Sequence, residues 1–468
     1  MNIDPYNLSR RSFLSKSLAG AGAGLVLGAP NLLRATNAGG ADDIHIALVG
    51  FGKQAEVLLN CLKNIPGLYF QAVCDISKYR IGKFRSAMRG MPNVTSKGFY
   101  TDIDDMLEKE KGLDAAIIAT PDFWHSPHTV KCLEAGLHVY CEKMMAHTIE
   151  AAREMVRAME RTGKLCQIGH QRRSNPRYRY TLDHLINGKK ICGQIVNVNG
   201  QWNRSLSGSQ DINKPEPGKD YPPATVVPAD VLKRNGFKDM QQYYNWRFYR
   251  DLSGGPISDL GAHQIDVFNW FLGAVPKRVY ATGGNPYFKE REHFDNVMCL
   301  FDYDTPQGEV RAFYQVLTTT SYGVGFYESF LGTEAAIRMS EITSTCAIYR
   351  ESTAPEWGDL IEQGYLVNKP APPRPPKSSG AVQAYESPPP EGFELPGDLP
   401  YYRDNKGQLV NKPAHQPHLE NFFNAVRGKA TLNCDARHAF ESEAPIFWVN
   451  PSALSKQPIE LTAQHLTV

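Results

Sequence analysis

Three ionisable residues in this sequence have the types and spacing that could move a proton. Asp259 and His263 stand four residues apart, which places them on one face if the segment is helical. A histidine can give or take a proton near neutral pH, and a lysine ammonium group can stabilise negative charge on oxygen. Lys143 is such a lysine, just beyond the apolar run 137–141. We interpret them as candidate catalytic groups. The alternatives are a helix-surface contact for Asp259 and His263, and a surface position for Lys143.

A glycine-rich turn lies near the start of the chain. Residues 44–49 are apolar and rich in β-branched side chains, which predicts a buried strand, and a helical pattern follows up to Leu62. The G-x-G-x-x-A turn between them indicates that the pyrophosphate of a dinucleotide binds at the helix N-terminus. The candidate cofactor residues of the turn are Gly50, Phe51, Gly52, Lys53 and Gln54.

An acidic residue follows at the distance that this motif requires. A second expected strand, 70–74, ends in Asp75, twenty residues past Ala55. A carboxylate there can accept hydrogen bonds from the ribose hydroxyls and repels a 2′-phosphate, which favours NAD over NADP. The alternative is a plain glycine turn followed by a solvent-facing aspartate.

Strands and helices continue to alternate up to about residue 170. We expect strands at 113–119, 137–141 and 165–169, and helices at 126–135 and 148–161. This alternation predicts a doubly wound parallel sheet, and so a Rossmann domain over residues 43–170. Ligands of such sheets bind beyond the carboxyl ends of the strands. Further candidate cofactor contacts are therefore Thr120, Pro121, Trp124, His125, Glu142 and Lys143.

Besides Trp124 and His125, which are also candidates for the substrate pocket, two further groups of polar and aromatic residues are candidates for binding a substrate. An aromatic face packs against the C–H surface of a sugar, and arginine donates hydrogen bonds to its hydroxyls. Alternatively, Trp246 belongs to the core and the arginines face solvent or pair with carboxylates. The candidates are Gln171, Arg172 and Arg173 after the last Rossmann strand, and Tyr244, Trp246 and Arg247 before Asp259.

Together these motifs resemble the Gfo/Idh/MocA oxidoreductase family, named for glucose-fructose oxidoreductase and inositol dehydrogenase. The resemblance rests on residues 50–55, 119–121, 142–143 and 259–263, extends from about residue 43 to 345, and resumes over 418–428. It implies an α/β fold in which an α+β domain with a large, open, mainly antiparallel sheet follows the Rossmann domain. The sequence agrees, because residues 195–202, 278–282, 297–303, 310–317 and 327–331 each have the pattern of a strand.

The resemblance also implies roles for the candidate residues. It makes His263 the acid/base, lets Asp259 orient the substrate or tune the histidine, and places Lys143 against substrate and cofactor. Met144 stands where the family usually has proline. Members commonly use the exposed face of the second sheet for oligomerisation, so we expect a homo-oligomer.

The first 41 residues resemble an export signal rather than part of the fold. Arg10 and Arg11 are followed by Phe13, Leu14 and a glycine- and alanine-rich apolar run, 18–29, which is typical of a twin-arginine signal. That run is too short for a comfortable membrane span, so we expect no stable span after signal removal. A periplasmic or otherwise exported enzyme would have to load NAD before export and hold it tightly.

Composition and charge argue against several other classes of protein. The 51 Lys and Arg residues nearly balance the 49 Asp and Glu residues, which gives no reason to expect a nucleic-acid partner. Nine cysteines without a CxxC pair do not predict a disulfide framework or a zinc site. His170, His263 and Asp259 could converge, but no HxxxH or HxH spacing supports a metal site, and we expect none.

The remaining chain divides into three expected parts. Residues 171–352 form the substrate and oligomerisation domain. Residues 353–413 are proline-rich, and because they retain several aromatic residues we favour an ordered arm over a free linker. Residues 414–468 contain a helix at 418–426 and a tail, which we expect to pack on the second domain.

The function that this reasoning favours is NAD-dependent oxidation or reduction of a ring hydroxyl of a small-molecule sugar or glycoside. Oxidation at C3 is its concrete form, by resemblance to glycoside dehydrogenases. One alternative is an NAD-recycling glycoside hydrolase that oxidises C3, eliminates the aglycone, adds water and reduces the sugar again. Another is a non-catalytic sugar-binding protein that keeps the fold.

Overall fold

The computed structural model describes residues 42–94, 98–209, 220–323, 325–369, 391–397, 399 and 412–468. The predicted export signal, residues 1–41, lies outside these ranges, as do residues 370–390 and 400–411 of the proline-rich segment. None of the helices in the described ranges has both the length and the apolar character that crossing a bilayer requires.

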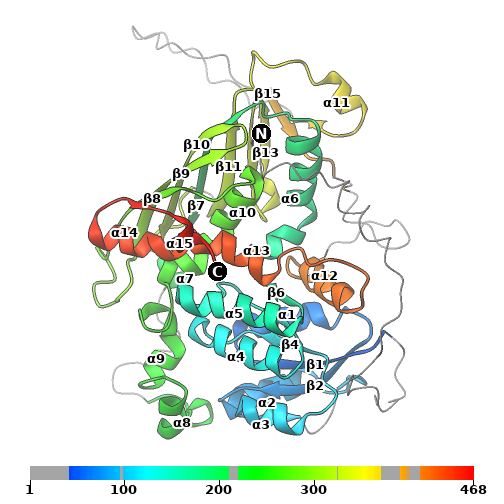
Figure 1. Cartoon of the computed structure of the whole chain (residues 1–468), viewed down its shortest axis with the longest axis vertical. Helices are drawn as coiled ribbons and strands as arrows, with labels where there is room; N and C mark the ends of the chain where they lie inside the picture. The colour runs from blue at the N-terminus through cyan, green and yellow to red at the C-terminus, as the bar shows by residue number, and fades with distance from the viewer. Residues whose placement is uncertain are drawn as a thin grey trace, which may run out of the picture. The chain divides into compact units, whose positions relative to one another are not determined.

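The first domain contains the predicted Rossmann sheet, six parallel strands in the order β3-β2-β1-β4-β5-β6 (Figure 1). The strand order reverses between β1 and β4, and a ligand of such a sheet binds beyond the carboxyl ends of the strands at this point. The elements are β1 (Ile44–Val49), α1 (Lys53–Leu62), β2 (Leu68–Cys74), α2 (Lys78–Ala87), β3 (Phe99–Tyr100), α3 (Ile103–Lys109), β4 (Ala115–Ile118), α4 (Asp122–Glu134), β5 (His138–Cys141), α5 (Ile149–Thr162) and β6 (Cys166–Ile168).

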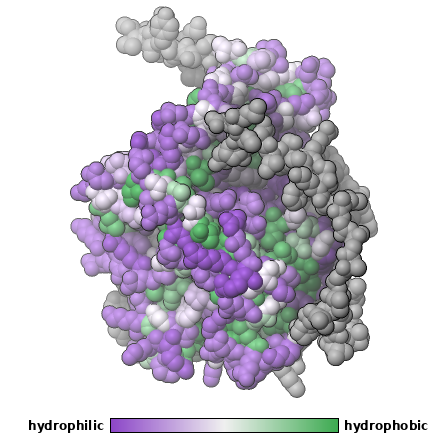
Figure 2. Space-filling view, viewed as in Figure 1, coloured by the Kyte–Doolittle hydropathy of each residue, from purple (hydrophilic) through white to green (hydrophobic). Residues whose placement is uncertain are grey.

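Alternate residues of the strands face two separate cores. Along β1, Ile46 and Leu48 pack with α1 and α2, whereas Ala47 and Val49 pack with α3, α4 and α5. Successive side chains of a strand point to opposite faces, so a strand that is buried on both faces is apolar throughout. The face of the molecule in Figure 2 is largely hydrophilic, with hydrophobic residues in smaller groups.

The second domain is built on a ten-stranded sheet with the order β14-β15-β13-β12-β11-β7-β10-β9-β8-β16. Among its described strands, β7 and β10 pair in parallel and the other neighbours are antiparallel, as the resemblance implies. The strands are β7 (Ile195–Asn203), β8 (Arg278–Gly284), β9 (Asn296–Thr305), β10 (Gly308–Leu317), β11 (Phe326–Gly332), β12 (Ala335–Met339), β13 (Ala347–Arg350), β14 (Val367–Asn368), β15 (Glu391–Glu394) and β16 (Ile459–Glu460).

One face of this sheet packs against helices, and the opposite face is partly open. Val198 of β7 belongs to the core under the helices, and Trp202 packs against that core. The covering elements are α6 (Pro176–Tyr180), the π-helices η2 (Thr181–Gly188) and η5 (Ile257–Gly261), α10 (Ala262–Leu272) and α14 (Val449–Ser455).

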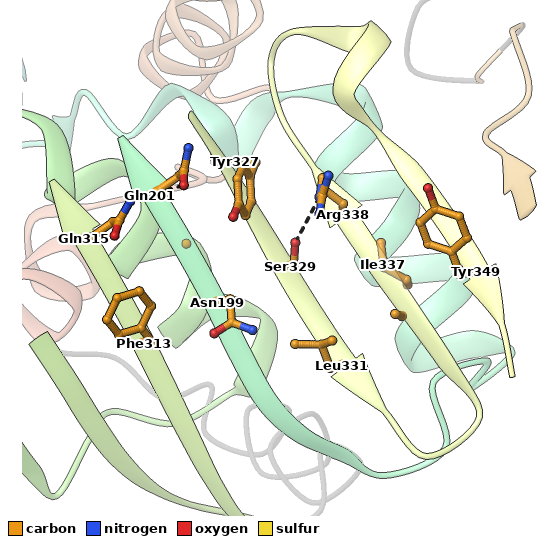
Figure 3. Close-up of a pocket in the computed structure, with 12 residues that line it drawn as sticks. Asn199, Gln201, Phe313, Gln315, Tyr327, Ser329, Leu331, Ile337, Arg338 and Tyr349 are labelled. Carbon is orange, nitrogen blue, oxygen red and sulfur yellow. Dashed lines mark hydrogen bonds between the residues drawn. The ribbon is translucent and has the colours of Figure 1, made fainter. Parts of the chain in front are cut away.

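The open face carries a hollow of about 500 Å³ (Figure 3). Asn199 and Gln201 line it from β7, and Arg338 donates a hydrogen bond from Nε to Ser329 Oγ at 3.4 Å beside it. Along β7, Asn199 and Gln201 alternate with Val198 and Trp202, which point to the other face of the sheet. There the ring of Trp202 lies against His263. The hollow therefore lies on the face of the sheet opposite the candidate catalytic residues.

An insertion between β7 and α10, described over residues 220–253, covers part of the Rossmann domain. Its small apolar core includes Leu232, Phe237 and Tyr243, and Phe123 from the N-terminus of α4 packs against that core. The insertion is further joined to α4 because Trp124 Nε1 donates to the carbonyl of Asn235 at 3.0 Å. The short helices between β7 and α10 are α7 (Leu206–Ser209), α8 (Ala229–Arg234) and α9 (Met240–Asn245).

The C-terminal segment corrects one expectation. We predicted that the helix near 418–426 packs on the second domain, and α12 does contact residues Gln171–Ser174, but it also packs against α1 and β5 and places Leu419, Phe422 and Phe423 in a Rossmann core. The tail packs on the second domain through α14 and β16. The remaining described α-helices are α11 (Gly358–Glu362), α12 (Gln416–Val426), α13 (Ala436–Glu443) and α15 (Ala463–Leu466).

Candidate functional site

The glycine-rich turn has the geometry that a dinucleotide requires. Gly50 has φ +83°, and a Cβ atom there would lie 2.8 Å from the carbonyl oxygen of Ala119, so a larger residue does not fit. Gly52 is the N-cap of α1, and no side chain caps the first amides of this helix. These amides and the helix dipole favour an anion at this position. The turn thus fits the diphosphate of NAD.

Asp75 supports the turn through both carboxylate oxygens. Oδ2 accepts from the amide of Phe51 at 2.7 Å, and Oδ1 accepts from the amide of Ser77 at 2.8 Å. Burial raises the pKa of Asp75, while the Arg80 charge and these two hydrogen bonds act in the opposite direction. Each oxygen retains a second lone pair, so contact with a ribose hydroxyl stays a prediction. The Phe51 side chain itself is buried against Phe84 and does not face the turn.

His125 lies between the loops after β4 and β5. Its Nδ1 lies 2.6 Å from the carbonyl of Met144, and its Nε2 lies 2.8 Å from the carbonyl of Thr120. Burial lowers the pKa of His125 to about 4, so near pH 7 the neutral ring carries one N–H and donates to one of these two carbonyls. We predicted His125 as a cofactor contact, but both ring nitrogens face the protein, and the residue instead positions the loop that carries Lys143.

Glu142 connects the loop after β5 to the glycine-rich turn. Its Oε1 accepts from Gln54 Nε2 at 3.2 Å, and the Gln54 nitrogen lies 3.0 Å from Nε2 of His415. His415 is the N-cap of α12, so the C-terminal segment reaches the turn. Pro121 precedes α4 as its N-cap, and Lys53 opens α1 with an exposed side chain.

Lys143 and Asp259, from the two domains, meet at the centre of the candidate site. The ammonium group of Lys143 donates to the main-chain carbonyl of Asp259 and lies 3.6 Å from its Oδ1. Arg247 Nε lies 3.3 Å from Oδ1, and an Arg204 guanidinium nitrogen lies 3.9 Å from Oδ2. Burial alone would raise the pKa of Asp259, but Arg247, Lys143 and Arg204 outweigh it and hold that pKa below its usual range. Asp259 is therefore ionised.

His263 lies one turn further, in α10. The ring of Trp202 packs against it with centroids 5.5 Å apart. Burial and then the charges of Lys143 and Arg172 lower the pKa of His263 well below its usual value, so the ring is neutral and can accept a proton. The described structure has no hydrogen bond or ion pair between Asp259 and His263, because Asp259 lies in the π-helical turn and its carboxylate contacts the cations.

A second carboxyl lies near Lys143 and Asp259. Asp122, the first residue of α4, is buried, and burial raises its pKa to about 7. Arg247 and Lys143 lower that pKa, whereas Asp259 and Glu443 raise it. Asp122 is thus partly protonated near neutral pH. Within the described ranges, no group of three or more His, Cys, Asp or Glu side chains is placed to hold a metal ion.

Glu443, from α13, holds the loop after Lys143. Its Oε2 accepts from the amide of Met145 at 2.8 Å, and its Oε1 lies 2.8 Å from Nε2 of His170. Both side chains are buried, and Nδ1 of His170 lies 3.6 Å from Asp266. The position of Lys143 therefore depends on a carboxylate three hundred residues further along the chain.

Three predicted substrate contacts serve the core instead. Arg172 is buried and pairs with Glu328 and Glu341, and Arg173 is paired through two nitrogens with Asp266. Gln171 Nε2 donates to Glu341 at 3.2 Å. Buried charges of this kind have to be paired, so these side chains hold the core together and do not contact a substrate. The alternative interpretation, pairing with carboxylates, is the one that the geometry supports.

Of the other predicted substrate residues, Tyr244, Trp246 and Arg247, only Arg247 reaches the candidate site. Arg247 reaches Asp259, as described, and its guanidinium lies 4.1 Å from the centroid of the Trp246 ring. Trp246 is buried in the insertion, and Tyr244 stacks on Tyr221. Trp124, which we predicted at the cofactor, stacks on His128 with ring centroids 4.8 Å apart. Its indole N–H donates a hydrogen bond to the carbonyl of Asn235 in the insertion.

Sequence reasoning missed four residues of the site: Asp122, Trp202, Arg204 and Glu443. Trp202 and Arg204 stand at the end of β7, a position that the expected strand 195–202 could have indicated. Asp122 directly follows Thr120 and Pro121 in the loop after β4, so its position there was the available signal. Glu443 gives no local signal, because its role arises from contacts between distant segments.

Both domains match one family of known proteins. Residues 44–170 match the family's "Oxidoreductase family, NAD-binding Rossmann fold", and residues 225–461 match its "Oxidoreductase family, C-terminal alpha/beta domain". An inositol 2-dehydrogenase of Rubrobacter xylanophilus is 32% identical over 331 residues, which cover 70% of this chain and 79% of the relative.

Two further relatives show the range of proteins that this chain resembles. A 2,7-anhydro-N-acetylneuraminate hydratase of Mediterraneibacter gnavus is 25% identical over 40% of each chain, so this chain spans less than half of that relative's length. Among solved structures, the WlbA dehydrogenase from Bordetella pertussis, in complex with NADH and UDP-GlcNAcA, superposes with a TM-score of 0.62 at 18% identity. The match covers 90% of this chain and 98% of that chain. This likeness shows the fold.

Proposed function

Because the chain belongs to the Gfo/Idh/MocA oxidoreductase family, we propose that it transfers hydride between NAD and a ring carbon that carries a hydroxyl in a sugar or glycoside. The observation that carries the proposal is the meeting of Lys143 and Asp259 beside His263, near the carboxyl ends of the Rossmann strands. Inositol and amino-sugar derivatives in the names of the relatives support this class of substrate.

His263, Lys143 and Asp259 have different roles in the proposed oxidation of the alcohol. Bound NAD would accept the hydride that leaves the ring carbon. The neutral ring of His263 accepts the hydroxyl proton, and the ammonium group of Lys143 stabilises the negative charge that develops on the oxygen. Asp259 holds Lys143 and Arg247 in place through its ionised carboxylate. In the reverse direction His263 returns the proton.

Three finer properties belong to the same proposal. Oxidation at C3 of the ring is its concrete form. We also propose that the protein is exported through the twin-arginine route with NAD already bound, because the pair Arg10-Arg11 and the apolar run after it are typical of that signal. Asp75 favours NAD over NADP, since a carboxylate repels a 2′-phosphate.

The test uses the purified mature protein. We expect denaturation to release NAD or NADH, and a matching glycoside to raise the absorbance of reduced nicotinamide before denaturation. Release of an aglycone without net NADH would assign the alternative, an NAD-recycling glycoside hydrolase. A protein that contains no nucleotide and binds no added NAD would contradict the proposal.

A further inference from the structure

The candidate site has a surplus of positive charge. Lys143, Arg204 and Arg247 each place a nitrogen within 4 Å of the Asp259 carboxylate. Three cations therefore share one ionised carboxylate. Asp122 offsets only part of the surplus, since burial raises its pKa to about 7 and leaves it partly protonated near neutral pH.

The two arginines retain accessible hydrogen-bond donors. The side chains of Arg204 and Arg247 are 35% and 41% exposed, compared with 11% for Lys143. Each guanidinium carries five N–H donors, and the contact with Asp259 uses only part of them. Their planes are also supported by aromatic rings, Arg247 by Trp246 and Arg204 by Trp202, at 4.1 and 5.9 Å from the ring centroids. Two supported guanidinium groups suit the planar, bidentate recognition of a carboxylate.

The cofactor does not account for these two cations. The diphosphate site is at the N-terminus of α1, where the basic side chains are Lys53, which opens the helix, and Arg80, whose Nη1 lies 3.4 Å from the carbonyl of Phe51. Arg204 and Arg247 belong to the second domain and lie beside Asp259, where the substrate reacts. Their charge therefore faces the substrate.

We infer that the substrate is anionic: a uronic acid or its glycoside, whose carboxylate pairs with Arg204 and Arg247 while a ring hydroxyl faces Lys143 and His263. This inference rests on the proposed function and specifies the substrate class of that site. The carboxylate takes no part in the hydride transfer. It orients the ring, and the surplus charge excludes unpaired cationic sugars.

The first experiment measures binding without turnover. Protein loaded with NADH is titrated in a calorimeter with methyl β-D-glucuronide and with methyl β-D-glucoside, and with the corresponding galactose pair. A charge-assisted bidentate contact predicts that at least one uronide binds at least about tenfold more tightly than its neutral partner, and that added salt reduces the difference. Glucose 6-phosphate against glucose tests a phosphate in place of the carboxylate.

The second experiment assigns the preference to the two arginines. Arg204→Gln and Arg247→Gln should each reduce the ratio between uronide and neutral glycoside about tenfold or more, in binding and in kcat/KM of the NAD-loaded enzyme. Arg234→Gln, the same change on an exposed residue of α8, should leave the ratio unchanged.

The outcomes separate this inference from the proposed function. If neutral glycosides are oxidised and bind as well as the uronides, the function stands and the inference is wrong. A larger preference for the phosphate than for any uronide would also overturn the carboxylate assignment. If no sugar of either kind binds or reduces the bound NAD, the proposed function fails, and the inference fails with it.

Discussion

At the scale of single residues, Glu443 shows how a distant side chain sets the position of a reacting group. It accepts the amide hydrogen of Met145, two residues after Lys143, while His170 occupies its other oxygen. A buried amide that loses its acceptor costs about 1–3 kcal/mol. The loop can avoid part of that cost by shifting, and a shift would move the Lys143 ammonium group away from the developing charge.

Glu443→Ala should therefore lower kcat about 10- to 100-fold and change KM only a few-fold, since a small displacement of a catalytic group has effects of this size. Glu443→Gln should recover most of the rate, because its amide oxygen still accepts from Met145. Steady-state kinetics on the two variants provide the check, with the exposed Glu441→Gln on the same helix as the control. A Glu443→Ala protein that is less stable but retains its kcat would show that the residue is only structural.

Asp122 gives a prediction about pH. A carboxyl whose pKa is higher in the folded than in the unfolded state stabilises the fold fully below its unfolded pKa, and that contribution is lost as the pH rises through the folded value. For Asp122 this window runs from the ordinary value of 3.8 up to about 7. We expect Asp122→Asn to remove this dependence, so that its Tm relative to the original protein rises between pH 4 and pH 7 and is level above. Melting curves across this range measure it, and a constant difference would contradict the assigned pKa.

The sequence predicts residues whose function is set by local pattern and misses those set by long-range pairing. The glycine turn, Asp75, Lys143, Asp259 and His263 follow from motif and resemblance, and the structure brings the last three together. Arg172 and Arg173 carry the same donors as Arg247, and only the location of Glu328 and Asp266 decides that they are used in the core. Composition alone could not separate these arginines.

At the scale of elements, the insertion over residues 220–253 brings the second domain to the cofactor end of the Rossmann sheet. Arg80 Nε donates to the hydroxyl of Tyr243 at 2.9 Å, beside Asp75 and the glycine turn. Burial raises the pKa of Tyr243 above its usual value, so the hydroxyl keeps its proton and accepts from the guanidinium. The bond fixes Arg80 against the position expected for the adenosine half of NAD.

Tyr243→Phe should release bound NADH faster, by about tenfold, since a hydrogen bond to a charged group contributes about 1.5–3 kcal/mol. The decay of NADH fluorescence after mixing with excess NAD gives the rate. Tyr322→Phe makes the same change on a side chain that is 86% exposed and should have no effect. If both variants release NADH at the original rate, the insertion does not help to hold the cofactor.

The elements themselves follow the sequence closely wherever their pattern is local. The predicted strands of the Rossmann sheet lie within about two residues of β1, β2, β4, β5 and β6, because buried parallel strands are short apolar runs between turns. The helices α8 and α9 of the insertion have six residues each and were not predicted. Their stability comes from packing against Phe123 and Ile76 rather than from periodicity.

At the scale of the whole molecule, the cofactor site is assembled from segments that span the described chain. The turn at 50–54, the loops after β4 and β5, the insertion, His415 and Glu443 all contribute. A site of this kind exists only after the C-terminal segment has folded onto α1. All nine cysteines are unpaired and eight of them are buried, which fits folding in a reducing compartment. On the proposed export route, NAD would therefore enter the folded protein before export.

The proposed export through the twin-arginine route predicts where the cofactor is found. In a host with that pathway, the protein recovered outside the cytoplasm should contain close to one NAD or NADH per chain, because no NAD pool is present there to fill an empty site. Arg10→Lys together with Arg11→Lys should retain the protein in the cytoplasm with the same nucleotide content, since the substitutions change the signal and not the site. Nucleotide released from purified fractions, measured against protein, gives the ratio. An exported protein free of nucleotide, beside a retained variant that contains it, would mean that export does not preserve the bound cofactor.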